Sequence, residues 1–417
     1  MDNRIPQIWI HALGAKAGGG ITYLNAILPE ILLQLEGKDV RVVLLLPRAL
    51  DIELPEWVEV RALPLAARNW LTRIFFDQFI LPVWMKKEKV SALYCSGSFS
   101  PLIKTAPTVA LLRNAIYFDP RFLEREAPLR RLLLKLEGRL ITAGARNCKA
   151  IHYPSLSMRD LVESRAPRLA DRGAVNYYGV GKAFAEFDPT IETEPSEQDR
   201  TTFLYVMNYT LQKNLGFLLR ALALARREAL PVQAIVTSRL DSGPEACFEE
   251  DRAIIEENDL IRSGYLDAVG PHYGEDLIAL YRSVDACIFP SICESFGHPL
   301  LEAMALNKPL VCSDLAFARE ICGDYAIYID PDRPEDLLRI WKEWTRGTPE
   351  ISRVARGNVL SKFSWRSHVA NLIESLIEGK DKEKGKGEKE KAKKASLPFA
   401  FYLLPFAFLL CAASQVF

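Results

Sequence analysis

Two glutamates, Glu294 and Glu302, lie eight residues apart in a segment whose pattern can place them around one ligand. Residues 285–290 form an apolar run of strand length. Gly297 allows a close approach of the backbone, and Pro299 suits the first position of a helix. The segment therefore predicts a buried strand, a tight loop and a helix whose first turn carries Glu302.

The predicted helix that begins near Pro299 offers a site for an anion. Its first turn has free N–H groups and a partial positive charge, which suit a phosphate. Because Glu294 precedes this turn and Glu302 lies one turn inside it, the two carboxylates could hold hydroxyl groups on either side of a diphosphate. A nucleotide-sugar has this layout of sugar, diphosphate and ribose. The alternative is that the spacing arose by chance and both glutamates face solvent.

A lysine in a second loop, Lys213, is a candidate for the chemical step. It follows the expected strand 202–207 and precedes a helix. Its charge could neutralise a leaving diphosphate, although a solvated helix lysine is the alternative. No Asp-x-Asp site appears at a convincing strand end, and no His/Cys cluster has metal-ligand spacing, so we expect no metal. Lys213 and the helix N-terminus would then take the electrostatic role of a metal.

A glycine-rich loop near the N-terminus could contact the same ligand. Residues 14–20 follow the expected strand 7–11 and precede a helix, and Gly19 and Gly20 would let backbone come close to a phosphate. A turn that serves geometry alone is the alternative. The loop lacks the G-x-G-x-x-G spacing of dinucleotide sites, which argues against NAD or FAD as a cofactor.

The run from Tyr281 to Pro331 closely resembles the E-x7-E motif of retaining glycosyltransferases of the family 4 type (glycosyl transferases group 1). That family includes bacterial lipopolysaccharide and capsule transferases. The resemblance rests on Tyr281, Asp285, Pro290, Ser291, Glu294, Phe296, Gly297, Pro299, Glu302, Ala303, Met304, Pro309, Glu320 and Gly323. It implies an α/β protein of GT-B architecture, in which two Rossmann-like domains with parallel sheets face each other across a cleft.

The same resemblance implies roles for individual residues. Glu294 and Lys213 would be catalytic, with Glu294 orienting the sugar and supporting its developing positive charge, while Glu302 would hold the ribose. The donor-binding residues implied are Glu302, Phe296, Gly297, His298, Pro299, Leu300, Asn208, Gly19 and Gly20. The donor would be a UDP or GDP sugar, with no cofactor. Transfer would retain the anomeric configuration, and the leaving phosphate would accept the acceptor's proton.

Two departures from the family pattern keep a second function class open. Asn208 stands where the family usually has an arginine, and Arg239 is a candidate substitute. Many relatives carry a histidine where this chain has Arg113 and Asn114. These two residues, with His11, are candidates for the acceptor site, and a capping or loop role is the alternative. A catalytically weak or inactive scaffold of the same fold therefore stands beside a hexosyltransferase that builds cell-surface polysaccharide.

Composition agrees with an intracellular enzyme of two domains. The chain has 417 residues, is 49% hydrophobic and carries 53 basic and 53 acidic residues, so nothing predicts nucleic acid as a partner. Eight cysteines without a C-x-x-C pair predict reduced, buried thiols. The N-terminus lacks the pattern of a signal peptide, so we expect a cytoplasmic protein at or near the cytoplasmic face of the inner membrane.

Short apolar runs that alternate with helical patterns predict two parallel sheets. The expected strands are 7–11, 40–46, 92–95, 108–112 and 150–153, then 202–207, 232–237, 286–289, 310–312 and 326–329. Residues 183–200 are the best linker. The expected parts are an acceptor domain 1–185, a donor domain 198–363, a helix 364–378 that crosses back, a charged linker 379–396 and an apolar tail 397–417.

Three segments raise the question of a membrane surface. Residues 69–81, within the aromatic and basic stretch 68–89, could form an amphipathic helix that faces lipid headgroups, although core packing explains the aromatic residues equally well. The basic stretch 121–139 favours an anionic acceptor or surface. The tail 397–417 is long enough to span a bilayer, although two prolines weaken that reading.

Overall fold

The structure, a computed structural model, describes residues 5–16, 19–49, 54–170, 172–187, 200–240, 245–344 and 356–377, with backbone alone for 245–248. The described residues up to Ile377 belong to one compact unit. They form two parallel sheets with helices between most successive strands, which is the α/β class that the sequence predicts.

The first sheet has seven parallel strands in the order β3-β2-β1-β4-β5-β6-β7. Their bounds are β1 Gln7–His11, β2 Arg41–Leu46, β3 Val58–Ala62, β4 Ala92–Cys95, β5 Thr108–Leu111, β6 Ala150–Tyr153 and β7 Gly173–Val175. The apolar runs are buried on both faces, because Ile8 and Ile10 join one hydrophobic cluster and Trp9 joins another. This is the pattern of a sheet covered by helices on both sides.

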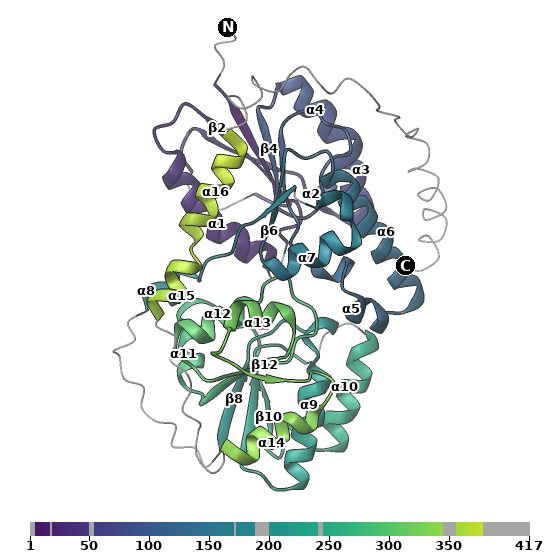
Figure 1. The fold of residues 1–417 in the computed structure, drawn as a ribbon, viewed down its shortest axis with the longest axis vertical. Coiled ribbons are helices and arrows are strands. Elements are labelled where there is room, and N and C mark those ends of the chain that lie inside the picture. The colour runs from purple at the N-terminus through teal and green to yellow at the C-terminus, as the bar shows by residue number, and fades with distance from the viewer. Residues whose placement is uncertain are drawn as a thin grey trace. The chain divides into compact units, whose positions relative to one another are not determined.

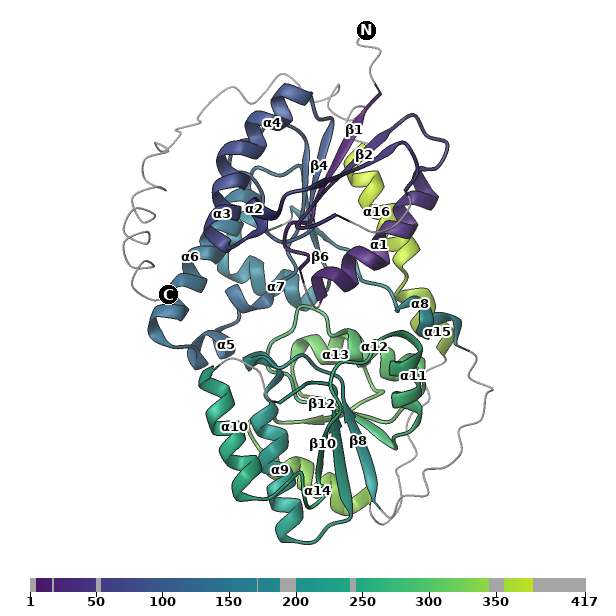
Figure 2. The same ribbon diagram turned by 180° about the vertical axis from the view of Figure 1, so that it is seen from behind.

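Two groups of helices cover this sheet (Figures 1 and 2). On one face lie α1 (Gly19–Leu35) and the last described helix, α16 (Trp365–Ile377), which pack against each other. The other face carries α2 (Pro64–Ala67), α3 (Trp70–Phe75), the π-helical turn η1 (Phe76–Ile80) and α4 (Leu81–Glu88). Later in the chain come α5 (Pro120–Arg125), α6 (Pro128–Ala145) and α7 (Leu156–Arg165).

The second sheet has six parallel strands in the order β10-β9-β8-β11-β12-β13. Its strands are β8 Thr201–Tyr205, β9 Val232–Val236, β10 Leu266–Ala268, β11 Ala286–Phe289, β12 Leu310–Ser313 and β13 Ile327–Ile329. Its helices are α8 (Lys182–Glu186), α9 (Leu215–Arg227), α10 (Glu245–Glu257), α11 (Gly274–Arg282), α12 (His298–Ala305), α13 (Ala316–Cys322), α14 (Pro334–Trp344) and α15 (Arg356–Lys362). In Figure 2, α9, α10 and α14 lie along one side of the sheet.

Both sheets have a switch point, where successive strands are added on opposite sides of the first one. In the first sheet this point lies between β1 and β4, and in the second between β8 and β11. Loops at the carboxyl ends of strands diverge at such a point, so ligands bind there in open α/β sheets. The topology therefore directs attention to the loops after β1, β4, β8 and β11.

The sequence predicted the central strands correctly, and β1, β4, β6 and β11 have the predicted bounds. Three strands were missed: β3, β7 and β10. Each lies at an edge or is only three residues long, and β3 (VEVRA) alternates polar and apolar residues instead of forming an apolar run. The short helix α8, Lys182–Glu186, lies at the start of the predicted linker 183–200; residues 188–199 lie outside the described ranges, so the linker stays a prediction.

The helical prediction for 69–81 is confirmed, and core packing accounts for part of its aromatic residues, while contact with lipid headgroups stays a prediction. Asn69 caps α3, and the helical path continues through η1 into α4. Phe76 is buried, while Phe75 and Phe79 are exposed. The segment therefore packs one aromatic group into the core and presents another to solvent.

Other predictions concern parts of the chain that the structure describes only in part. Six of the eight cysteines are described, and all six are buried and free, as predicted. Within the described ranges, no helix combines the length and the apolar character needed to cross a bilayer. The linker 379–396 and the tail 397–417 lie outside those ranges, so they stay predictions, as do the exact domain boundaries.

Candidate functional site

An ion pair lies at the switch point of the second sheet. Lys213 lies in the loop after β8, and its Nζ atom is 2.6 Å from Oε1 of Glu294 in the loop after β11. The two side chains are 15% and 16% exposed, so they are shielded from bulk water yet remain accessible. The fold thus brings together Lys213 and Glu294, the two residues that were predicted to be catalytic.

The backbone around Lys213 is fixed by its neighbours. The 3-10 turn Leu211–Lys213 ends at Asn214, which adopts a left-handed conformation with φ 55° that asparagine tolerates well. The Asn214 side chain donates to the carbonyls of Pro290 and Pro331 at 3.2 and 2.9 Å. These bonds tie the loop after β8 to the loops after β11 and β13, and the Tyr205 hydroxyl donates to the Lys213 carbonyl at 2.5 Å.

Glu294 is oriented by two donors that share one oxygen. The Ser291 hydroxyl donates to Oε1 at 3.0 Å, and the Lys213 ammonium addresses the same atom. The ammonium also lies 4.9 Å from the centroid of the buried Phe289 ring. A carboxylate held in this way has a defined direction before any ligand binds.

The second glutamate, Glu302, is held on α12 by a tyrosine. The Tyr281 hydroxyl donates to its Oε2 atom at 2.8 Å. Burial raises the pKa of Glu302 to about 7, although the Tyr281 hydroxyl and the charge of Lys213 act in the opposite direction. The carboxyl is therefore present in both protonation states near neutral pH.

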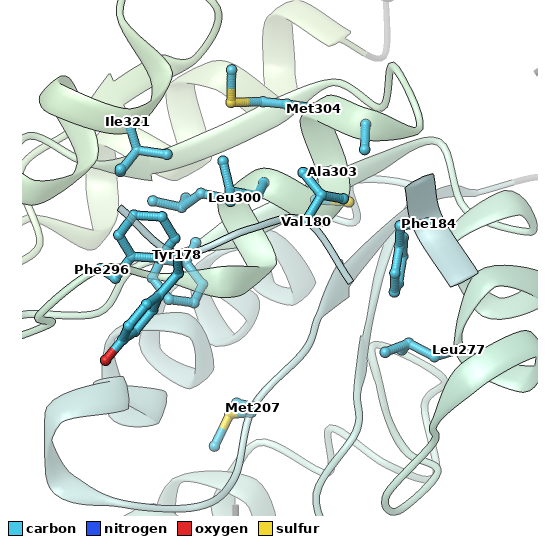
Figure 3. Packing of buried hydrophobic residues seen from close by; sticks show 14 of the residues in the cluster. Tyr178, Val180, Phe184, Met207, Leu277, Phe296, Leu300, Ala303, Met304 and Ile321 are labelled. Carbon is cyan, nitrogen blue, oxygen red and sulfur yellow. The ribbon is translucent and has the colours of Figure 1, made fainter. Parts of the chain in front are cut away.

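The N-terminus of α12 depends on a glycine. Gly297 has φ 95°, and a Cβ atom there would lie 3.0 Å from Leu300 Cδ1, so a side chain would be strained and crowded. The helix begins at His298, one residue before the predicted start, with Pro299 in its first turn. Phe296 and Leu300 are buried beneath this turn (Figure 3).

His298 lies in an aromatic stack. Its ring is parallel to that of Tyr178 at 5.3 Å between centroids and also stacks on Trp365 at 5.9 Å. Burial, followed by the positive charges of Arg113 and Lys213, lowers the pKa of His298 to about 4. The imidazole is thus neutral at pH 7 and serves here as a packing group of the motif loop.

The switch point of the first sheet holds a different set of charges. His11 Nε2 lies 2.7 Å from Asp77 Oδ1, and Arg73 Nε lies 3.6 Å from Asp77 Oδ2. A Cβ atom at Gly14 or Gly97 would lie 2.6 or 2.8 Å from the Arg73 guanidinium. The guanidinium thus lies close to the backbone of the loops after β1 and β4, and a side chain at either glycine would have to displace it.

His11 itself is buried, with 1% exposure. In this arrangement the His11 side chain is not exposed to a bound acceptor, and its Nε2 atom is already hydrogen-bonded to Asp77. A role in the acceptor site stays a prediction, and it would operate through the Arg73 and Asp77 side chains.

The remaining candidates of the first sheet follow β5. Asn114 accepts the N–H of Ile116 at 3.4 Å, which is the capping role considered as the alternative. Arg113 instead lies over the Tyr23 ring, 5.1 Å from its centroid, and its Nη2 atom is 3.9 Å from the Cβ position of Gly19. Gly20 packs on the backbone of the preceding loop, where a Cβ would lie 3.1 Å from the Gly14 carbonyl.

The position of the missing arginine is exposed. Asn208 contributes its carbonyl to a bond from the Thr210 hydroxyl at 3.4 Å. Arg239, the predicted substitute, lies on the β9 side and lines a cavity of about 540 Å³ together with Tyr209, Asp251 and Ala268.

Family and fold comparisons agree with this geometry. Residues 187–356 match the family model described as Glycosyl transferases group 1. This part of the chain is therefore similar to glycosyl transferases group 1 domains. The matched range contains β8 to β13 and thus the whole switch point with Lys213 and Glu294.

A protein similar to part of this chain is the O-antigen chain mannosyltransferase B of Escherichia coli. It is 31% identical over 116 residues, which are 27% of this chain and 30% of that protein. The match thus spans less than a third of the relative's length.

Solved structures show that the likeness in fold extends further. A sucrose-phosphate synthase from Thermosynechococcus elongatus superposes with a TM-score of 0.65 at 15% identity, covering 88% of this chain and 98% of that one. HepE from Anabaena, in complex with UDP and glucose, gives a TM-score of 0.62 at 17% identity, covering 88% of this chain and 98% of that one. The two-sheet GT-B fold predicted from the motif is therefore confirmed.

Sequence reasoning assigned no individual role to several residues that build this candidate site. Tyr281, Ser291 and Glu320 belong to the motif, but their partners lie far away along the chain. Glu320 accepts the N–H groups of Leu156 and Ser157 at 2.6 and 2.7 Å and so caps α7 of the first sheet. Only the spacing of the motif could have hinted at these contacts.

Proposed function

We propose that this chain is a retaining, metal-independent glycosyltransferase of the family 4 type. It would move a sugar from a UDP or GDP sugar to a glycan or lipid-linked acceptor during synthesis of a cell-surface polysaccharide. The observation that carries this proposal is the Lys213–Glu294 pair at the switch point of the second sheet, beside the N-terminus of α12. At such a point a parallel sheet binds its ligand.

The proposed mechanism gives each group one task. The donor diphosphate lies at the N-terminus of α12, where free N–H groups favour an anion. Lys213 stabilises the charge that develops on the diphosphate as the bond between the anomeric carbon and the phosphate oxygen breaks. The acceptor oxygen then bonds to that carbon on the same face, and its proton passes to the leaving phosphate. Glu294 orients the sugar, and Glu302 holds the ribose.

The comparisons support the choice of donors to test. The E. coli relative is named as a mannosyltransferase, and the HepE structure contains UDP and glucose. A GDP-hexose and a UDP-hexose are therefore the first two candidates. Thermal-shift screening of the purified protein against UDP, GDP and ADP sugars would identify the donor, because a ligand that binds the native state raises the melting temperature.

The screen has a matched control. Glu302→Gln should reduce the shift that the donor produces, since Gln keeps the size of the side chain but lacks the charge that holds the ribose. Glu335→Gln, on α14, should leave it unchanged. If no nucleotide-sugar shifts the wild-type protein, the enzyme proposal fails.

A scaffold role is the second candidate, and Asn208 is the observation that favours it. Loss of a cation from the donor site would reduce the stabilisation of the leaving diphosphate and so slow turnover. A protein that binds a nucleotide-sugar, yet shows neither transfer nor donor hydrolysis above the rate of Glu294→Ala, would support the scaffold.

We also propose that the acceptor lies at a membrane surface. The helical path α2 to α4 exposes a patch of apolar side chains, namely Leu65, Phe75, Phe79, Ile80 and Val83. Arg68, Lys86 and Lys87 are exposed on the same path. An apolar patch with a basic rim matches the interface of an anionic bilayer.

Sedimentation with phosphatidylglycerol vesicles tests this placement. The double variant Phe75→Ser/Phe79→Ser should reduce the bound fraction several-fold, whereas Leu33→Ser, an exposed residue of α1, should not. Equal binding of all three proteins would reject the patch. Deletion from Lys380 onward tests the tail separately, and unchanged membrane fractionation would reject an anchor there.

A further inference from the structure

The donor site of the second sheet is short of positive charge. Lys213 is paired with Glu294 at 2.6 Å, so the pair adds no net charge to balance a diphosphate. Asn208 occupies the position where the family resemblance predicts an arginine, and Arg239 lies on the β9 side of the sheet, where it lines a cavity with Tyr209 and Asp251. A leaving diphosphate carries about two negative charges, which the N-terminus of α12 alone neutralises poorly.

Arg113 is a cation that the first sheet directs toward this site. Its guanidinium lies over the Tyr23 ring, and Tyr23 packs against Tyr178 at 5.2 Å between ring centroids. Tyr178 in turn stacks on His298, the residue that opens α12, at 5.3 Å. A series of ring contacts therefore leads from Arg113 to His298, the first residue of the helix at which we propose the diphosphate binds.

Two further observations set Arg113 apart from a structural arginine. Its Nη2 atom lies beside Gly19, the glycine that the sequence places at the donor phosphates. In the ranges that the structure describes, the guanidinium faces this glycine and a ring, and no carboxylate pairs with it. Its backbone N–H is held by the Ser98 hydroxyl at 3.2 Å, which fixes the start of the side chain.

The electrostatics of His298 agree with this position. After burial, the charges of Arg113 and of Lys213 are the next causes that lower the pKa of this imidazole. Both cations thus act on the residue at the start of α12, one from each sheet.

We propose that Arg113 supplies the second cation of the donor site and stabilises the leaving diphosphate in place of the arginine absent at Asn208. This inference rests on the proposed function. Arg113 would donate two N–H groups to phosphate oxygens, a geometry that suits a guanidinium. As the bond between the anomeric carbon and the phosphate oxygen breaks, the electron pair moves to that oxygen, and Arg113 and Lys213 share the stabilisation of its charge.

Binding of nucleoside diphosphates tests the inference without requiring turnover. Titration calorimetry would compare UDP with uridine, and GDP with guanosine, for four full-length proteins: wild type, Arg113→Gln, Arg113→Gln/Asn208→Arg and Arg239→Gln. Arg113→Gln should weaken binding of the diphosphate about tenfold and leave the nucleoside unchanged. Asn208→Arg should restore most of this loss, and Arg239→Gln should behave as wild type.

The outcomes separate the two proposals. Equal diphosphate binding by wild type and Arg113→Gln overturns the inference while the proposed function stands. A loss that Asn208→Arg does not recover also overturns it, because Arg113 then acts on the fold or on the acceptor. Arg113→Lys guards against misfolding, since it keeps the charge and should retain more than half of the binding free energy that Gln loses. If the wild type binds neither UDP nor GDP, the proposed function itself fails.

Discussion

The two switch points of this molecule hold their charged groups in opposite ways. In the second sheet, Lys213 and Glu294 lie in loops and are partly exposed, next to the Ser291 hydroxyl and the Phe289 ring. In the first sheet, His11 and Asp77 are buried at the end of a strand and within a π-helical turn, with exposures of 1% each. The same topology thus produces one accessible ion pair and one sealed pair.

This difference in exposure indicates a chemical role for the pair in the second sheet and a structural role for the pair in the first. A charge that must follow a reacting phosphate has to be reachable and free to exchange partners, as Lys213 is. A buried pair with no access instead orients what surrounds it, here Arg73 between the loops at Gly14 and Gly97. We therefore expect substitutions in the second sheet to reduce rate, and substitutions in the first to reduce stability.

The largest effect is expected at Lys213. Lys213→Met removes the charge that stabilises the leaving group, and kcat should fall by about 10²–10³-fold. Steady-state donor turnover measures this. Lys182→Met, on the exposed surface of α8, is the matched control and should keep full activity. A loss of less than about threefold at Lys213 would remove it from the chemical step.

Substitutions in the buried His11–Asp77 pair should reduce the stability of the fold and leave donor binding intact. Asp77→Ala leaves a buried imidazole and a guanidinium without their carboxylate, which should cost about 3 kcal/mol of folding free energy. Thermal melting with and without donor measures both properties, and the donor-induced shift should persist. Asp77→Asn, which keeps a hydrogen-bond acceptor for His11, should lose less. Loss of donor binding without loss of stability would contradict the structural role that we assign to this pair.

A smaller effect is expected from the titration of Glu302. Burial raises the pKa of this carboxyl to about 7, so lowering the pH from 8 to 6 protonates most of it before a donor binds. If the carboxylate holds the ribose, donor affinity should fall about tenfold over this range and rise again with pH. Donor titrations at several pH values test this, and Glu302→Gln should be insensitive. A pH profile that persists in Glu302→Gln would assign it to another group.

The sequence predicted the centre of each sheet and the donor side of the site for a physical reason. Strands buried on both faces leave continuous apolar runs, and a loop that ends in Gly297 and Pro299 encodes its own turn and helix start. Glu294 and Glu302 were found because their spacing is local. The edge strand β3 was missed because its alternating residues lack that run.

Contacts between distant segments could not be predicted from the sequence. Arg73 and Asp77 lie more than 60 residues from His11, and the bond of Glu320 to α7 joins residues of different sheets. Arg113 was suggested only as a sugar or acceptor contact, because nothing in one sequence shows that Tyr23 and Tyr178 connect it with His298. Such groupings depend on tertiary packing.

The most direct test of the account compares the two switch points in one assay. Full-length wild type, Glu294→Ala and Asp77→Asn would be incubated with labelled UDP and GDP hexoses, and the release of the nucleoside diphosphate would be measured. We predict release by wild type and by Asp77→Asn, and a rate at least 100-fold lower for Glu294→Ala, the loss expected for a group that acts on the transition state. Equal release by wild type and Glu294→Ala, or none by wild type with any donor, would contradict the claim that the second switch point transfers a sugar.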